Sequence, residues 1–279
     1  MNFQYLGTAA AEGWPAIFCN CEFCLEAAKR GGRDIRTRSQ AIINDDLLID
    51  LPPDTYMHKL QQGLDLSRVR YLLITHKHMD HFYPQELTVR GSGYSHNMVS
   101  EDMDIYLAEE AREMYRKINW ESDAATEEHL HFHIIKAFET FQAGPYTVTP
   151  LPARHMGEGN EPFVYYIEDQ EGKTVLYLHD TGYFLDSVWD FLSKLKKPAD
   201  MVSFDACFGP RETARGGHMG FPEIAEVMSR MKEIGAIDER TVCVANHYSH
   251  NCYALYDDLV PLAAKKGLLV SYDGMSLSI

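Results

Sequence analysis

Short apolar runs separated by polar turns recur along the chain, and runs of this kind are typical of buried strands. The predicted strands are Phe3–Leu6, Ala41–Ile43, Leu47–Leu51, Tyr71–Ile74, Ile105–Leu107, Tyr146–Leu151, Phe163–Ile167, Val175–Leu178, Met201–Phe204, Val242–Ala245 and Leu268–Ser271. Apolar residues at helical spacing predict helices over Asp54–Gln62, Glu109–Ile118, Leu185–Lys196, Pro222–Ile234 and Tyr253–Lys265. Strands outnumber helices. This order favours an α/β fold in which two mixed sheets pack together with helices outside, a four-layered αββα sandwich.

No low-complexity tract or Pro/Ser-rich linker divides the sequence, so we expect one domain over residues 1–279. The pattern is weakest over residues 84–125, a segment rich in Gly, Ser, Met and acidic residues. Because it follows the most polar motif of the chain, it is predicted to form a flap or rim over a site. An ordinary surface excursion is the alternative.

The charge balance argues against some classes of binding partner. The chain has 41 acidic and 26 basic residues, a formal net charge of -15, and this repels a phosphate backbone. A nucleic-acid partner is therefore not expected. The N-terminus lacks the basic start of a signal peptide, and no apolar stretch approaches the roughly 18 residues of a spanning helix. We expect a cytoplasmic protein with no membrane partner, whose six cysteines are thiols or metal ligands.

The clearest chemical motif begins where the apolar run Tyr71–Ile74 stops. Four candidate metal ligands follow closely: His76, His78, Asp80 and His81. Imidazole and carboxylate together suit divalent zinc, manganese, iron or nickel. A single histidine after a strand would more simply cap the strand or pair with an acid. Three histidines and an aspartate at this spacing instead predict a metal centre that activates water for hydrolysis.

Two ions need more ligands than one loop provides. His155, Asp180 and His247 each follow an apolar strand pattern, at the strand ends where sites of α/β folds gather. Asp180 is the natural bridging residue, since a carboxylate can give one oxygen to each ion. Each of the three alone is equally well explained as a satisfied polar residue. Together they complete two coordination shells, which predicts a dinuclear centre.

Cys19, Cys21 and Cys24 place three thiols on one tight loop. Thiolates at this spacing suit a tetrahedral structural zinc, for which His250 is the predicted fourth ligand. Such a zinc would fix the N-terminal loop beside the catalytic residues. The alternatives are a redox pair or free buried cysteines.

The chain resembles the metallo-β-lactamase superfamily, whose hallmark His-x-His-x-Asp-His is present at residues 76–81. The match extends from Gly7-Thr8-Ala9 to Ser249-His250-Asn251. The cysteine loop with its two later histidines is similar to the phosphoribosyl 1,2-cyclic phosphodiesterases of the carbon–phosphorus lyase pathway. This resemblance implies an αββα sandwich, a dinuclear phosphodiesterase site, the structural zinc and a homodimer. It assigns one ion to His76, His78, His155 and Asp180, and the other to Asp80, His81, Asp180 and His247.

His218, between glycines in Gly216-Gly217-His218-Met219-Gly220, matches a family histidine that binds phosphate or protonates the leaving oxygen. A histidine between glycines can approach a ligand closely, and an exposed turn histidine is the alternative. The chain departs from the family at Ala9, where a glycine is usual, and over residues 82–87. Because residues 82–87 would line the substrate pocket, the departure concerns the substrate rather than the metal chemistry.

The predicted function is hydrolysis of a small anionic ester, such as phosphoribosyl 1,2-cyclic phosphate. In this hypothesis Asp80 orients the nucleophile and His218 donates a proton to the leaving oxygen. A thioester or lactone hydrolase would use the same ions on a neutral substrate. A tRNA-processing nuclease would need a basic exosite, and a non-enzymatic metal-binding protein would typically lack ligands that are present here.

Overall fold

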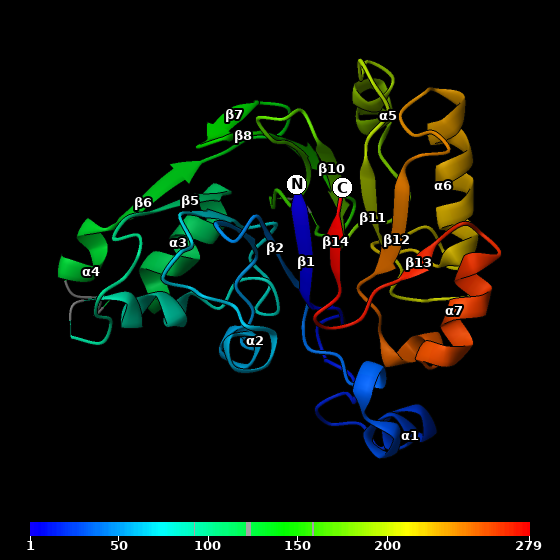
Figure 1. The fold of residues 1–279 in the computed structure, drawn as a ribbon, viewed down its shortest axis with the longest axis horizontal. Coiled ribbons are helices and arrows are strands. Elements are labelled where there is room, and N and C mark those ends of the chain that lie inside the picture. Colours follow the sequence, from blue (N-terminus) through cyan, green and yellow to red (C-terminus); the bar gives the residue numbers. More distant parts are fainter. Residues whose placement is uncertain (92, 121–123, 158) are drawn as a thin grey trace.

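Two seven-stranded sheets face each other in the computed structural model, which describes residues 1–91, 93–120, 124–157 and 159–279 (Figure 1). The first sheet has the order β14 (Ser276–Ser278), β1 (Asn2–Gly7), β2 (Gln40–Ile43), β3 (Leu47–Ile49), β4 (Tyr71–Leu73), β5 (Met103–Leu107) and β6 (Leu130–Ile134). The second has the order β13 (Leu269–Val270), β12 (Val242–Asn246), β11 (Met201–Asp205), β10 (Thr174–Leu178), β9 (Phe163–Glu168), β8 (Tyr146–Pro152) and β7 (Phe141–Ala143).

Helices cover the outer faces of both sheets, which completes the predicted αββα sandwich (Figure 1). Those beside the first sheet are α2 (Thr55–Gln62), the 3-10 helix η2 (Pro84–Arg90), α3 (Glu109–Ile118) and α4 (Ala124–Glu128). Those beside the second sheet are α5 (Asp186–Leu192), α6 (Phe221–Glu233) and α7 (Tyr256–Ala264). Near the chain ends lie α1 (Glu22–Arg30), η1 (Gly32–Asp34) and η3 (His250–Cys252). No described helix is long and apolar enough to cross a membrane.

Three apolar cores hold these layers together. The central core lies between the sheets and includes Tyr5, Tyr165 and Tyr177, all fully buried. The two outer cores pack the helices onto the sheets, with Leu72 on the first sheet and Val202 on the second as examples. Because strands of both sheets are buried on both faces, they appear in the sequence as continuous apolar runs.

Some predicted boundaries are wrong. The helix predicted to run to Lys196 ends at Leu192 in α5, and the helix predicted from Tyr253 begins at Tyr256 in α7. The second difference has a local cause, because Tyr253 has a φ of 56° and ends η3 in a left-handed conformation. The prediction also placed Cys24 on a loop, whereas it lies in α1.

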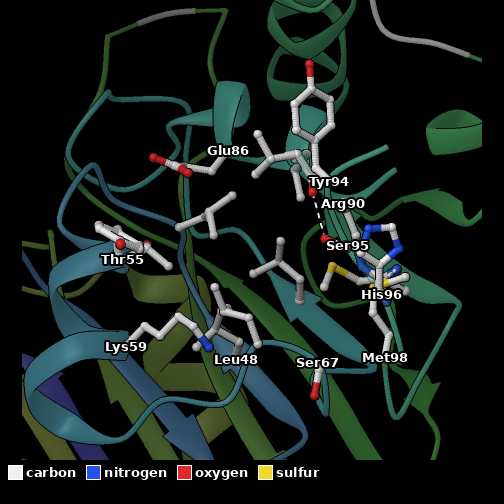
Figure 2. A pocket seen from close by; sticks show the side chains of 17 residues that line it. Leu48, Thr55, Lys59, Ser67, Glu86, Arg90, Tyr94, Ser95, His96 and Met98 are labelled. Atoms are coloured by element: carbon white, nitrogen blue, oxygen red, sulfur yellow. Dashed lines mark hydrogen bonds between the residues drawn. The ribbon is translucent and has the colours of Figure 1, made fainter. Parts of the chain in front are cut away.

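The segment 84–125 contributes to the first sheet and its outer layer through η2, β5 and α3. Residues 92 and 121–123 of this segment lie outside the described residues. A cavity of about 570 Å³ lies between α2, η2 and the loop that follows η2 (Figure 2). Its wall includes Leu48 and Leu72 of the sheet, with Lys59 and Arg90 among its polar members. The predicted role as a flap over the metal ligands stays a prediction.

Candidate metal centres

The predicted catalytic ligands lie just after the ends of four strands, one in the first sheet and three in the second. The loop 75–81 follows β4, His155 follows β8, Asp180 follows β10 and His247 follows β12. β8 and β10 are both antiparallel to β9, and β10, β11 and β12 are parallel, so the ends of β8, β10 and β12 share one edge of the second sheet, whereas β4 belongs to the first sheet. The fold therefore gathers residues that are far apart in the sequence.

Asp180 lies at the centre of the cluster. Its Oδ2 is 2.7 Å from His81 Nε2 and 2.9 Å from His247 Nε2, while its Oδ1 is 3.3 Å from His155 Nε2. Asp80 joins this group through a 3.2 Å contact between its Oδ2 and His81 Nε2. The two oxygens of Asp180 thus face different sets of imidazoles.

The second set is formed by His76, His78 and His155, whose ligand nitrogens all lie within 4.8 Å of one another. His78 Nδ1 is 2.9 Å from His76 Nε2 and 3.2 Å from His155 Nε2. The structure therefore brings together every residue that the sequence predicted for the dinuclear centre. Which ion each residue binds stays a prediction.

The chemistry of these donors fits divalent ions. His81 Nε2, His247 Nε2 and Asp180 Oδ2 are buried, and among the described residues none of these atoms has a partner with hydrogen-bond geometry. A buried polar atom without a hydrogen bond is costly, and a shared cation removes that cost. Imidazole nitrogens facing a carboxylate are a ligand set for zinc, manganese or iron.

The backbone supports the same interpretation. Asp180 and His247 have φ values of 51° and 64°, in the left-handed region that residues other than glycine seldom adopt. Asp50, beside the same cluster, has a φ of 67°. Strained conformations of this kind cost on the order of 1–3 kcal/mol and persist at functional sites, where the surrounding structure fixes them.

Asp50 orients the loop that carries the motif. It follows β3, is fully buried, and accepts hydrogen bonds from Thr75 N at 2.8 Å and Thr75 Oγ1 at 2.9 Å. Its Oδ2 also lies 2.7 Å from His81 Nδ1. Through this contact Nδ1 of His81 donates to a carboxylate, which leaves Nε2 to face Asp180.

Asp205, at the end of β11, orients two further histidines. Its Oδ2 is 2.9 Å from His218 Nδ1 and 3.5 Å from His247 Nδ1. Its Oδ1 accepts hydrogen bonds from the backbone N–H groups of Cys207 and Met219, both at 3.1 Å. His218 thus lies beside the cluster as predicted, with its ring centroid 4.9 Å from that of His155.

The loop that carries His218 comes very close to the loop after Asp180. A Cβ built on Gly182 would lie 1.5 Å from the carbonyl oxygen of Gly216, so only glycine fits there. A Cβ on Gly217 would lie 3.1 Å from His155 Nδ1. The glycines around His218 therefore allow a close approach, in agreement with the sequence interpretation.

Burial and charge shift the pKa values of the cluster in opposite directions. Burial lowers the pKa of His76 well below its usual value, and His81 lowers it further. Burial would also lower the pKa of His81, but the carboxylates of Asp180 and Asp80 raise it well above its usual value. For Asp180, burial opposes ionisation, but His247 and His81 hold its pKa well below the usual range. The carboxylate that would bind metal is therefore ionised.

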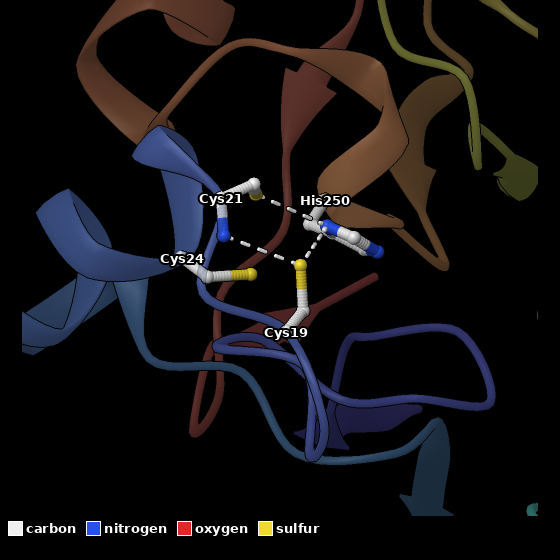
Figure 3. Close-up of side chains that lie close together, drawn as sticks. All are labelled: Cys19, Cys21, Cys24 and His250. Atoms are coloured by element: carbon white, nitrogen blue, oxygen red, sulfur yellow. Dashed lines mark hydrogen bonds between the residues drawn. The ribbon is translucent and has the colours of Figure 1, made fainter.

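A second candidate metal centre lies at the N-terminal loop (Figure 3). The ligand atoms of Cys19, Cys21, Cys24 and His250 all lie within 4.8 Å of one another. His250 Nδ1 is 3.6 Å from Cys19 Sγ and 3.5 Å from Cys21 Sγ. Burial alone would raise the pKa of the Cys21 thiol, but hydrogen bonds, first that from His250, lower it to about 6. Three sulfurs and one imidazole nitrogen form a ligand set for tetrahedral zinc.

Sequence interpretation missed Asp50 and Asp205. Asp205 directly follows the predicted strand Met201–Phe204, just as Asp180 follows Val175–Leu178. Asp50 lies within the predicted strand Leu47–Leu51, which ends at Ile49 in the structure. The strand end is the available signal for Asp205, and a charged residue within an otherwise apolar run is the available signal for Asp50.

Comparison with known families identifies the family of this chain. Residues 46–244 match the family described as beta-lactamase superfamily domain, and the chain belongs to this family. With the ligand geometry above, the protein is a metal-dependent hydrolase of the metallo-β-lactamase fold. Comparison with curated proteins gave no match.

Solved structures share the fold at low sequence identity. A structure described as a new diphosphatase from the PhnP family is 20% identical, with a TM-score of 0.73, covering 100% of this chain and 97% of that one. Zinc-bound PqqB from Methylobacterium extorquens is 18% identical, with a TM-score of 0.74 and 100% of both chains covered. The short form of human tRNase Z is 18% identical, with a TM-score of 0.67, covering 100% of this chain and 99% of that one.

Proposed function

We propose that this hydrolase cleaves a small cyclic phosphodiester, such as phosphoribosyl 1,2-cyclic phosphate, at a centre that holds two divalent ions. The position of Asp180 carries the proposal, because its Oδ1 faces His155 while its Oδ2 faces His81 and His247. A carboxylate in this position can give one oxygen to each of two ions. Two neighbouring ions suit displacement at phosphorus.

The proposed ligand sets are those that the family resemblance implies, and the clustering of these residues supports them. One ion would be held by His76, His78, His155 and Asp180, and the other by Asp80, His81, Asp180 and His247. When bound, zinc or manganese, or alternatively iron or nickel, lowers the pKa of a water molecule and neutralises charge on phosphate oxygens. A structural zinc would be held by Cys19, Cys21, Cys24 and His250.

The protein's own groups provide orientation and a proton. Asp80, of which 8% is exposed, would orient the attacking water. His218 Nδ1 donates to Asp205, so the proton for the leaving alkoxide oxygen would come from the other ring nitrogen, Nε2. A quarter of the His218 side chain is exposed (25%), which allows it to meet a substrate.

The substrate class is proposed to be anionic. Lys77 lies between two predicted ligands in the sequence, and Arg154 directly precedes His155. Because both cations adjoin predicted ligands in the sequence, they are proposed to contact an anionic ester despite the overall charge of -15.

The homodimer implied by the resemblance is proposed as well, and sedimentation equilibrium of the metal-loaded protein tests it.

The experiment combines elemental analysis with a substrate panel. We expect two transition-metal equivalents besides one zinc, with turnover of bis-p-nitrophenyl phosphate and of a ribose cyclic phosphate. Arg154→Gln should raise KM for the cyclic phosphate more than for a neutral lactone. Turnover of neutral thioesters or lactones without diesterase activity would refute the substrate class. A single catalytic equivalent in a fully active enzyme would refute the dinuclear centre.

A further inference from the structure

Three histidines line one face of the edge strand β6, far along the first sheet from β1. His131 and His133 belong to β6 and His129 directly precedes it, so the three alternate along the strand and share a face. Asp104 of β5 and Asp102 just before β5 lie on the same face of the neighbouring strand. We call these five residues the histidine strip. None of them belongs to the predicted dinuclear or zinc centre.

The strip continues the inner face of the first sheet beyond the central core. Tyr106, two residues after Asp104, belongs to that core and stacks on Phe141 of β7 at a centroid distance of 4.5 Å. The His133 ring also stacks on the Tyr106 ring, at a centroid distance of 4.8 Å. Beyond this stack the face is open, since 39% of the His129 side chain and 46% of the His131 side chain are exposed.

Two imidazoles of the strip converge on one carboxylate oxygen. His129 Nδ1 is 3.0 Å and His131 Nε2 is 3.1 Å from the same atom, Oδ1 of Asp102. Strand register pairs His131 with Asp104, yet its ring turns toward Asp102. Asp104 instead accepts a hydrogen bond from His133, with 2.6 Å between His133 Nε2 and Asp104 Oδ1.

These distances match the requirements of a metal ligand set. Donors at about 2.0–2.1 Å from a tetrahedral ion are themselves about 3.3 Å apart. The contacts between the Asp102 oxygen and the two nitrogens need to open by only a few tenths of an ångström. The same arrangement, two imidazole nitrogens against one carboxylate oxygen, occurs in the predicted dinuclear centre, where Asp180 Oδ2 faces His81 and His247.

We propose that His129, His131 and Asp102 form a further metal site on the surface, for a divalent transition ion such as zinc, nickel or copper. Three protein donors leave one position of a tetrahedral ion to water. The carboxylate offsets the charge of the cation, and the imidazoles are ligands in their neutral form. Because Asp102 adjoins β5 and both histidines belong to β6 or adjoin it, the ion ties the edge strand of the first sheet to its neighbour.

The experiment counts zinc equivalents in the full-length, metal-loaded protein. The total is the zinc retained after dialysis plus the zinc taken up with micromolar affinity in a calorimetric titration. We expect the double variant His129→Ala/His131→Ala to hold one equivalent fewer than the wild-type protein. Its hydrolase activity should be unchanged, which also shows that it folds. Added zinc should raise the Tm of the wild-type protein more than that of the double variant.

The matched control is His96→Ala, which removes an exposed histidine outside the strip and should keep the wild-type total. Asp102→Asn should weaken uptake at the same site, since it replaces the charged donor. Equal totals for the wild-type protein and the double variant would overturn the proposal. A loss in His96→Ala as large as that in the double variant would overturn it too, because uptake would then reflect exposed histidines in general.

Discussion

The predicted dinuclear centre and the histidine strip use the same chemical groups in opposite environments. In both, imidazole nitrogens face one carboxylate oxygen. The carboxylate is almost buried at Asp180, with 5% of the side chain exposed, and largely open at Asp102, with 64% exposed. Water can satisfy the groups of the strip, whereas at Asp180 the protein or a bound ion must supply every partner.

This difference determines what each cluster costs the fold. Around Asp180 the structure contains left-handed backbone at Asp180 and His247, and buried polar atoms without hydrogen-bond geometry among the described residues. The strip lies on regular strands and shows neither feature. Burial therefore separates a site that the fold is built to hold from one that the fold merely tolerates. The predictions below test this contrast, beginning with the largest effect.

Removing the central carboxylate should abolish hydrolysis. We expect Asp180→Ala to lower kcat/KM by about 10⁴, or roughly 5 kcal/mol of transition-state stabilisation. It should also release transition metal, because three imidazoles lose the two carboxylate oxygens that they face. Steady-state kinetics and elemental analysis measure both effects. The control Asp190→Ala changes an exposed carboxylate on α5 and should behave as the wild-type protein. A variant of Asp180 that keeps a tenth of the activity would contradict the central role.

The proton donor should matter less than the metals. We expect His218→Gln to lower kcat by about 10²–10³ while the metal content stays unchanged, as is usual for loss of a general acid. A substrate whose leaving group is p-nitrophenolate needs little protonation, so its kcat should fall far less than that of an alkyl diester. Equal losses on the two substrates would indicate that His218 only positions the substrate.

The sequence predicted the buried parts of this arrangement better than the exposed ones. Strands covered on both faces, such as β10 and β11, appear as apolar runs. The half-exposed β6, in which histidines alternate with Leu130, Phe132 and Ile134, was missed, as were β7, β14, α1 and α4. Apolar runs reveal burial on two faces, whereas alternation with polar residues was needed to find β6.

The site residues that directly follow a predicted strand could be predicted from the sequence. His155, Asp180 and His247 could be chosen because each follows an apolar run, and parallel strands bring such ends together. The sequence could not reveal that Asp205 would hold His218, since that contact depends on how the loop of His218 returns to the end of β11. Close approach of loops is a tertiary property. Only the glycines around His218 indicated it.

His58 is buried like the predicted dinuclear centre but belongs to neither candidate metal centre nor to the histidine strip, and its effect should lie between theirs. His58 of α2 is 1% exposed, and its Nδ1 donates to Gln40 Oε1 at 2.5 Å. Burial lowers the pKa of His58 to about 4, below its value in the unfolded chain. Between about pH 6.5 and pH 4 the unfolded chain therefore binds a proton at His58 that the folded protein does not bind. Protonation favours the unfolded chain, so the free energy of unfolding decreases as the pH falls through this range.

We expect this effect to cost about 2 kcal/mol of unfolding free energy between pH 7.5 and pH 5. Urea denaturation at the two pH values measures it. In His58→Gln the pH-dependent loss should be smaller by that amount, although the variant is less stable at pH 7.5. Exposed His96 is the matched control, and His96→Gln should keep the wild-type pH dependence. The same slope in His58→Gln as in the wild-type protein would show that His58 is not the responsible group.

The smallest effect should appear in the strip. Without added metal, His131→Ala should change the free energy of unfolding by less than about 0.5 kcal/mol. The half-exposed ring contacts the exposed carboxylate of Asp102, and water can replace that contact in the variant. Urea denaturation of the protein in the presence of a chelator measures this. A loss above about 1 kcal/mol under these conditions would mean that the strip stabilises β6 directly, so that its histidines are structural even before any ion binds. With zinc present the wild-type protein should gain stability that His131→Ala does not, and that difference separates a ligand from a merely tolerated surface histidine.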